Sequence, residues 1–297
     1  MKLELFKDAV LISVVKRIPG NRRKVDLEDV ELEVGGQAYN GEKSELHLGK
    51  DLLESVEIKD IRHEFNKFGL YLARRRVPGN FFRAGCYVVK KTRLPEIYAE
   101  YQARRAGVKL GVDAFCGAYD ERRAQAKVRL GNLYREDEYP TEDKFRGAVD
   151  LKMLVVELAE PEGIDPAIKA QQAAEAEAEW KDAVNDVRLA LRTAMQGFVA
   201  HFAERLRPGE DGAKKVITEK KVARFREFLE FFSDRDITDD AKLAELVGQA
   251  KGLLDHADVG LMRQDGMFRA QLNDAFGQME QAVGALVEEQ QSRMISF

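Results

Sequence analysis

The side chains best suited to metal binding or nucleophilic catalysis are four histidines and two cysteines. The histidines are His47, His63, His201 and His256. No two of them stand three or four residues apart, so the chain offers no local metal-ligand spacing. His63-Glu64 resembles the start of a zinc-protease motif, but Lys67 stands where the second histidine would be. We interpret the histidines as structural or surface residues and expect neither metal nor cofactor.

The two cysteines, Cys86 and Cys116, lie in apolar and aromatic surroundings. Reduced, buried thiols are the favoured interpretation, and a single disulfide is the alternative. Cys116 has no candidate base within a helical turn, and the chain contains no nucleophile elbow, Walker A loop or dinucleotide glycine fingerprint. We therefore predict that the protein is not an enzyme, and a catalytic site assembled in space is the remaining enzymatic alternative.

The densest acidic cluster is SDRDITDD, residues 233–240. A calcium loop requires oxygen ligands at alternate positions, a central glycine and a distant glutamate, and this stretch lacks the glycine. A short polar residue before an apolar helical pattern more commonly caps the helix. The cluster therefore predicts a helix N-cap at Thr238 or Asp239.

Charge is distributed unevenly along the chain. Residues 58–135 carry 18 lysines and arginines against 7 acids, a net charge of +11, although the whole chain has a net charge of −4. Residues 136–297 carry 21 against 33, a net charge of −12. Such polarity suits either docking between protein surfaces or binding of a polyanion on one face.

The basic stretch supplies the candidate interaction surface. Its aromatic neighbours Phe81, Phe82 and Tyr87 allow a nucleic-acid groove, in which phosphates pair with cations and bases stack on rings. The favoured alternative is that these arginines pair with acids of the same fold or of another subunit, with residues 157–186 as the expected acidic partner. The predicted surface comprises Arg22, Arg23, Arg74, Arg75, Arg76, Arg83, Lys90, Lys91, Arg93, Arg104 and Arg105.

The N-terminal half alternates strand and helix signals. β-Branched runs predict buried strands over 9–15 and 84–91, and helical spacing predicts a helix from about 57 to Pro78. Residues 25–50 read as short helix and loop. Pro19-Gly20 fits a type II turn, which needs a positive φ at the glycine. A helix is expected from 95 to about 131, and residues 145–158 are ambiguous between helix and strand, with strand favoured.

The C-terminal half reads as helix throughout. Apolar residues at steps of three and four predict one continuous helix from Asp165 to about Leu206, with Trp180, Val187, Leu191, Phe198 and Phe202 on its apolar stripe. Three shorter helices are expected over 218–233, 239–254 and 261–291.

These elements predict a mainly α fold: an elongated antiparallel bundle of long, coiled-coil-like helices with a small β element from the N-terminal half. Two regions are expected. Residues 1–160 form a mixed α/β region with basic helices, and residues 161–297 form an acidic all-helical bundle that packs with helix 95–131.

The N-terminus contains Glu4 and Asp8 where a signal peptide would be basic and then apolar, and no stretch has the roughly 18–20 apolar residues of a membrane span. We expect a cytoplasmic protein.

Four segments resemble a family of uncharacterised phage and mobile-element proteins, a domain-of-unknown-function family. They are residues 10–30 (VLISVVKRIPGNRRKVDLEDV), 46–82, 94–105 (LPEIYAEYQARR) and 217–232 (ITEKKVARFREFLEFF). In this family a short strand with a basic turn precedes a Gly-Lys stretch, a helix and a long coiled region. The chain departs from the pattern where Gly-Asn and Phe-Phe follow Pro78.

Members of that family are often encoded beside MoxR-type AAA+ ATPases and von Willebrand factor A-domain proteins. The resemblance implies a non-catalytic helical scaffold or adaptor that self-associates or docks on such an ATPase machine. The alternative is a nucleic-acid-binding accessory protein that uses the basic segment 74–129.

Overall fold

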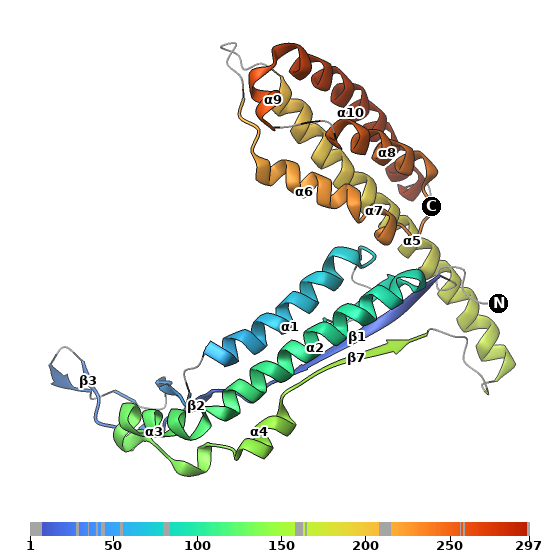
Figure 1. The fold of residues 1–297 in the computed structure, drawn as a ribbon. Coiled ribbons are helices and arrows are strands. Elements are labelled where there is room, and N and C mark those ends of the chain that lie inside the picture. The colour runs from blue at the N-terminus through green and yellow to red at the C-terminus, as the bar shows by residue number, and fades with distance from the viewer. Residues whose placement is uncertain are drawn as a thin grey trace. The chain divides into compact units, whose positions relative to one another are not determined.

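The computed structural model describes residues 8–27, 30–34, 36–39, 41–42, 45–53, 56–79, 84–157, 163, 165–207, 215–255, 257 and 259–295. The fold is mainly helical, 69% helix against 12% strand, with a small three-stranded sheet and two two-stranded ladders in the described residues (Figure 1). The mainly α class with a small β element is confirmed. No helix in the described part of the chain is both long and apolar enough to cross a membrane.

The chain forms two compact units. Unit 1 comprises residues 1–13, 72–95 and 155–297, and unit 2 comprises residues 14–71 and 96–154. The units interleave in the sequence because the chain passes from one to the other four times. The predicted boundary at residue 160 would separate two independently folding regions, 1–160 and 161–297. That boundary stays a prediction.

Three strands form the sheet, in the order β6-β1-β7. They are β1 (Ala9–Arg17), β6 (Cys86–Lys90) and β7 (Asp150–Val156). β1 and β6 are antiparallel, with Ala9 opposite Lys90 and Ser13 opposite Cys86. The predicted strands at 9–15 and 84–91 are thus confirmed. β7 confirms the strand favoured within 145–158, although the first residues of that stretch belong to a helix.

The helices of unit 1 follow the expected pattern with extra breaks. They are α5 (Pro166–Leu206), α6 (Glu219–Glu230), α7 (Phe232–Arg235), α8 (Ala241–Asp255), α9 (Val259–Gln264) and α10 (Gly266–Ile295). α10 packs along α5, with α6 and α8 also in this bundle (Figure 1). The 41-residue α5 confirms the predicted continuous helix.

The apolar core of unit 1 lies between these helices and the strands β1 and β6. Val187, Leu191 and Phe202 of the predicted α5 stripe are buried in it. Trp180 and Phe198 are only partly buried and pack against its surface. Phe198 stacks on the fully buried Phe225 with ring centroids 5.1 Å apart.

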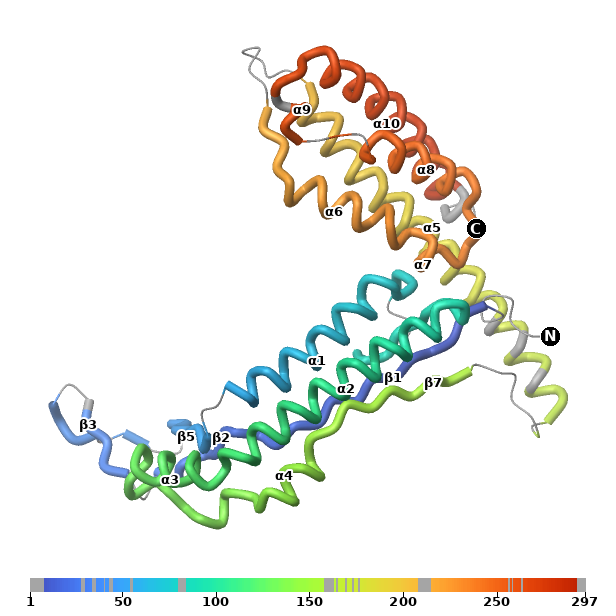
Figure 2. Tube along the Cα trace, viewed as in Figure 1, coloured from blue at the N-terminus to red at the C-terminus, as the bar shows by residue number. Residues whose placement is uncertain are grey.

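Unit 2 is built around two long helices, and Figure 2 follows their paths. Its helices are α1 (Val56–Arg75), α2 (Leu94–Gly117), α3 (Tyr119–Leu130) and α4 (Glu142–Ala148), of which the ends of α1 and α2 belong to unit 1. Glycine permits their close approach, because a Cβ on Gly111 would lie 2.8 Å from a side-chain carbon of Ile61. The expected single helix over 95–131 is wrong, because the chain breaks it at Ala118.

Residues 25–50 do not form the expected short helix and loop alone. Short strands pair there as hairpin-like ladders: β2 (Arg22–Lys24) with β5 (Gly49–Asp51), and β3 (Glu33–Val34) with β4 (Gln37–Ala38). The type II turn expected at Gly20 is also wrong, since Gly20 is not among the described glycines with positive φ. Gly79 is one of them, with φ of 123°.

Candidate interaction surfaces

Three arginines of the predicted surface make ion pairs inside unit 1. Arg74 Nε lies 2.6 Å from a carboxylate oxygen of Glu227. Arg93 Nε lies 2.7 Å from Asp234 Oδ1, and Arg75 Nε lies 3.7 Å from Asp234 Oδ2. The pairs join the end of α1 and the turn after β6 to α6 and α7.

Asp234 is the centre of this contact, which we call the arginine seam. Its carboxylate is buried, 4% exposed, so the neighbouring guanidinium groups compensate for its lost hydration. The Arg75 guanidinium also lies over the Phe231 ring, 4.5 Å from the centroid. Arg235 Nε donates a hydrogen bond of 2.6 Å to the Arg74 carbonyl oxygen. These charges hold segments of one unit together.

The expected acidic partner, residues 157–186, contributes to unit 1 through Glu157, which lies 2.6 Å from Lys91 Nζ. The acids of the arginine seam instead come from α6 and α7. Asp234 belongs to the cluster 233–240, so its charge was visible in the sequence. Its pairing with residues more than 140 positions away was not.

The seam predicts a contrast between two arginine substitutions. Arg93→Ala should lower the free energy of unfolding by about 1–2 kcal/mol, because it removes the ion pair between a partly exposed guanidinium and a buried carboxylate. Arg74→Ala should lower it by less than about 1 kcal/mol, because the Arg74–Glu227 pair is exposed. Urea titrations followed by the fluorescence of Trp180, the only tryptophan, measure both. Equal losses would contradict this account.

The rest of the predicted surface is dispersed over both units. In unit 1, Arg76 and Lys90 are half-buried. In unit 2, Arg22 is exposed and Arg23 donates a 3.1 Å hydrogen bond to the Gly20 carbonyl oxygen. Arg83 lies outside the described residues.

Arg104 and Arg105 are neighbours on α2 with different environments. Arg104 lies 2.8 Å from Glu64 of α1 and 2.9 Å from Glu100. Arg105 is exposed and lines an open groove of about 570 Å³ with Lys109, one turn further along. Neither Arg105 nor Lys109 has an ion pair to a residue that the structure describes. Arg146 is also exposed and lines this groove, but it pairs with Asp113.

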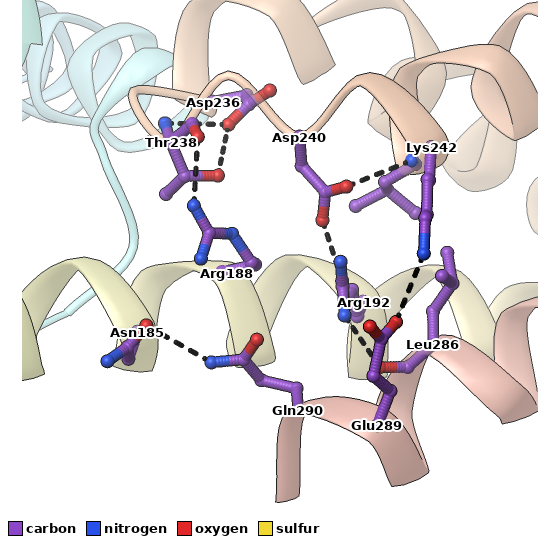
Figure 3. Close-up of polar contacts among 11 residues, drawn as sticks. Asn185, Arg188, Arg192, Asp236, Thr238, Asp240, Lys242, Leu286, Glu289 and Gln290 are labelled. Carbon is purple, nitrogen blue, oxygen red and sulfur yellow. Dashed lines mark hydrogen bonds and ion pairs between the residues drawn. The ribbon is translucent and has the colours of Figure 1, made fainter. Parts of the chain in front are cut away.

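The acidic cluster 233–240 forms a polar junction between α5, α8 and α10 (Figure 3). Arg192 Nε donates a 2.6 Å hydrogen bond to Asp240 Oδ2, and its Nη1 donates one of 2.7 Å to the Leu286 carbonyl oxygen. Both members of the ion pair are buried. Asp240 Oδ1 accepts from the Leu243 amide, so Asp240 caps α8. The predicted cap at Thr238 or Asp239 is therefore wrong by one or two residues.

Asp240 remains charged in this junction. Burial alone would raise the pKa of its carboxyl, but the hydrogen bonds from Arg192 and the Leu243 amide, together with nearby positive charge, outweigh it. The charges of Arg192 and Arg188 act in the same direction, and the net pKa lies below its ordinary value. The Arg192–Asp240 pair thus joins three helices: Asp240 links α5 to α8, and Arg192 links α5 to α10.

The histidines and cysteines do not converge on one site. His47 and His63 are exposed, and His256 lies outside the described residues. Both cysteines are free, as predicted, although Cys86 is only half-buried. Burial raises the pKa of the Cys116 thiol, which keeps it protonated. No group of three potential metal ligands occurs among the residues whose placement is described.

The first turns of α5 form an exposed helix. Every described side chain from Asp165 to Glu179 is exposed, and Ile168 exposes 58% of its surface. Asp165 caps this helix, because its Oδ1 accepts hydrogen bonds from the amides of Ala167 at 2.8 Å and Ile168 at 3.3 Å. Pro166 at the first helical position favours the same start. The helix is specified locally, and none of its side chains whose exposure the structure describes is buried.

Comparison of the chain with known proteins found no match among family models, curated proteins or solved structures.

Proposed function

We propose that this protein is a non-catalytic helical scaffold or adaptor that works by docking other protein chains. The observation that carries the proposal is the exposed start of α5, defined here as residues 165–179. An isolated helix of 12–15 residues is marginal in water, because most helical stability in proteins comes from packing one face. A capped helix that continues from a packed bundle and whose described side chains are all exposed presents a surface to a partner.

The arginine seam supports the same proposal. Its three arginines, Arg74, Arg75 and Arg93, already form ion pairs with Glu227 and Asp234. They are therefore poorly placed to neutralise phosphates. The polarity of the chain is then used largely to assemble the fold. The exposed part of α5 carries an acidic excess, with Glu175, Glu177 and Glu179.

The partner class that the family resemblance implies is a MoxR-type AAA+ ATPase, with its von Willebrand factor A-domain companion. Native mass of the full chain, alone and mixed with a MoxR-type AAA+ ATPase, tests this. We expect a complex that Glu175→Lys with Glu179→Lys weakens at least tenfold, while helical content stays unchanged. Absence of any complex over the micromolar range would remove the ATPase from the proposal.

A nucleic-acid-binding accessory role is the second candidate, and the exposed Arg105 and Lys109 favour it. They lie one turn apart beside a groove, so both can reach one backbone. If this role is correct, retention on single-stranded DNA should fall steeply with salt, and Arg105→Glu with Lys109→Glu should abolish it. Retention that ignores these changes would exclude this surface as the site.

A further inference from the structure

Unit 1 contains an open groove on the surface between α5 and α6. Its volume is about 380 Å³. The floor and wall are small and aromatic, and the rim carries positive side chains. The lining residues are Ala194, Gly197, Phe198 and His201 of α5, with Lys221 and Arg224 of α6.

The rim has positive electrostatic potential. Lys221 Nζ lies 2.9 Å from His201 Nε2. Burial lowers the pKa of His201, and the charges of Lys221 and Arg205 lower it further, against a smaller opposite effect of Glu204. Glu204 itself pairs with Lys215 at 3.3 Å. The groove therefore suits an occupant with small apolar residues and carboxylates.

The exposed start of α5 has that chemistry. Its sequence, PAIKAQQAAEAEAE over 166–179, is rich in alanine and carries three glutamates, of which Glu175 and Glu179 are one turn apart. The charge of the groove and that of this helix are complementary. A second copy of the chain supplies such a helix at a concentration equal to that of the groove.

The two surfaces share one face of the same helix. Residues at 3.6-residue periodicity on this face are 172, 179, 183, 190, 194, 197 and 201. If two α5 helices lie antiparallel with Ala190 of each copy at the twofold axis, position i faces position 380 − i of the other copy. Glu179 then faces His201, and Ala183 faces Gly197. The small residues let the backbones approach closely, and both grooves are filled at once, as a closed twofold interface requires.

We propose that two copies of this chain dimerise through α5, each laying residues 179–186 of its α5 across the α5–α6 groove of the other, with the acidic helix start, residues 165–179, running past the His201–Lys221 end of that groove. This deepens the proposed function, on which it rests, by naming a second copy as the chain that the exposed helix docks. In this dimer the α5–α6 groove of each copy is covered by the α5 helix of the other.

Cysteine cross-linking tests the register. Ala190 is exposed and lies at the expected axis, so Ala190→Cys should give a disulfide-linked dimer under mild oxidation. Ala282→Cys, at an exposed alanine of α10, is the matched control and should give at least tenfold less. The unaltered protein controls for Cys86 and Cys116, and peptide mapping must show that the bond joins the two introduced thiols.

Charge exchange tests the occupant. Lys221→Glu with Arg224→Glu should raise the dimer dissociation constant at least tenfold, as should Glu175→Lys with Glu179→Lys. The four changes together should restore dimerisation to within about threefold of the unaltered protein. Circular dichroism of each variant confirms that the helices are intact, since all four side chains are exposed.

A chain that stays monomeric at all salt concentrations, or that shows no rescue in the fourfold variant, would overturn this dimer. Such a monomer that still binds the ATPase would leave the proposed function standing. Conversely, a rescued dimer that binds no ATPase would support the interface and remove that partner.

Discussion

Replacing Arg192 with methionine is expected to lower the free energy of unfolding of unit 1 by about 3–5 kcal/mol. The change leaves the buried Asp240 carboxylate without its counter-ion, and a buried charge without a partner is strongly destabilising. It also removes the donor to the Leu286 carbonyl oxygen, so α10 loses one of its polar links to α5 and keeps the hydrogen bond from Gln290 to Asn185. Urea unfolding followed by Trp180 fluorescence measures the loss, because Trp180 packs against the core of this unit.

The control variant combines Arg192→Met with Asp240→Asn. Asparagine can still accept from the Leu243 amide and cap α8, but it brings no buried charge. We expect the double variant to be more stable than Arg192→Met alone by about 1–3 kcal/mol. Additive losses would show that the two residues do not act as a pair.

The pH dependence of the free energy of unfolding is an independent test of the Arg192–Asp240 pair. Because the pKa of Asp240 is lower in the folded protein than its ordinary value, its stabilisation is complete above the unfolded-state pKa. That stabilisation is lost as pH falls through the lower, folded-state pKa. The free energy of unfolding should therefore drop more steeply below about pH 4 in the unaltered protein than in the double variant.

Local patterns predicted the elements whose signals lie close together in sequence. The start of α5 follows from a short acidic cap, Asp165, and a proline after it, and its length follows from apolar residues at steps of three and four. The strands β1 and β6 follow from short β-branched runs. These signals need no knowledge of the partner element.

The breaks between helices were harder to predict, because they depend on tertiary contacts. The single helix expected over 95–131 ends at Gly117, and Ala118 takes a φ of −110° and a ψ of 13° before α3 begins. Tyr119 then packs on Phe115 and its hydroxyl bonds the Pro140 carbonyl oxygen. That fixed position explains why the chain turns here, and no local periodicity reveals it.

Dependence on tertiary contacts also limits what the charge pattern of a sequence predicts about a site. The uneven charge distribution favoured acidic partners for the basic segment, and Arg74, Arg75 and Arg93 have such partners. It did not identify Asp234 and Glu227, which are 141 to 159 positions away in the pairs observed. Reversing Arg75 to glutamate would place a second carboxylate beside the buried Asp234 and disrupt unit 1, so it is a poor probe of assembly.

Truncating Phe225 to alanine should lower the free energy of unfolding by about 3–5 kcal/mol, the range typical of a fully buried phenylalanine. The ring lies among three others: Phe198 at 5.1 Å, Phe202 at 5.2 Å and Phe276 at 6.1 Å between centroids. These rings come from α5, α6 and α10, so the cavity would open where three helices meet. Urea titration with Trp180 fluorescence again gives the measurement.

Phe198→Ala is the matched comparison, because Phe198 stacks on the same ring but is only half-buried in the groove wall. It should lower the free energy of unfolding by about 1–2 kcal/mol, in proportion to the smaller apolar area that it buries. The dimer proposal adds a second expectation for this variant: it should also weaken self-association, whereas Phe225→Leu, which keeps most of the core volume, should not. Equal stability losses for the two alanine variants would contradict the placement of Phe225 at the centre of this cluster.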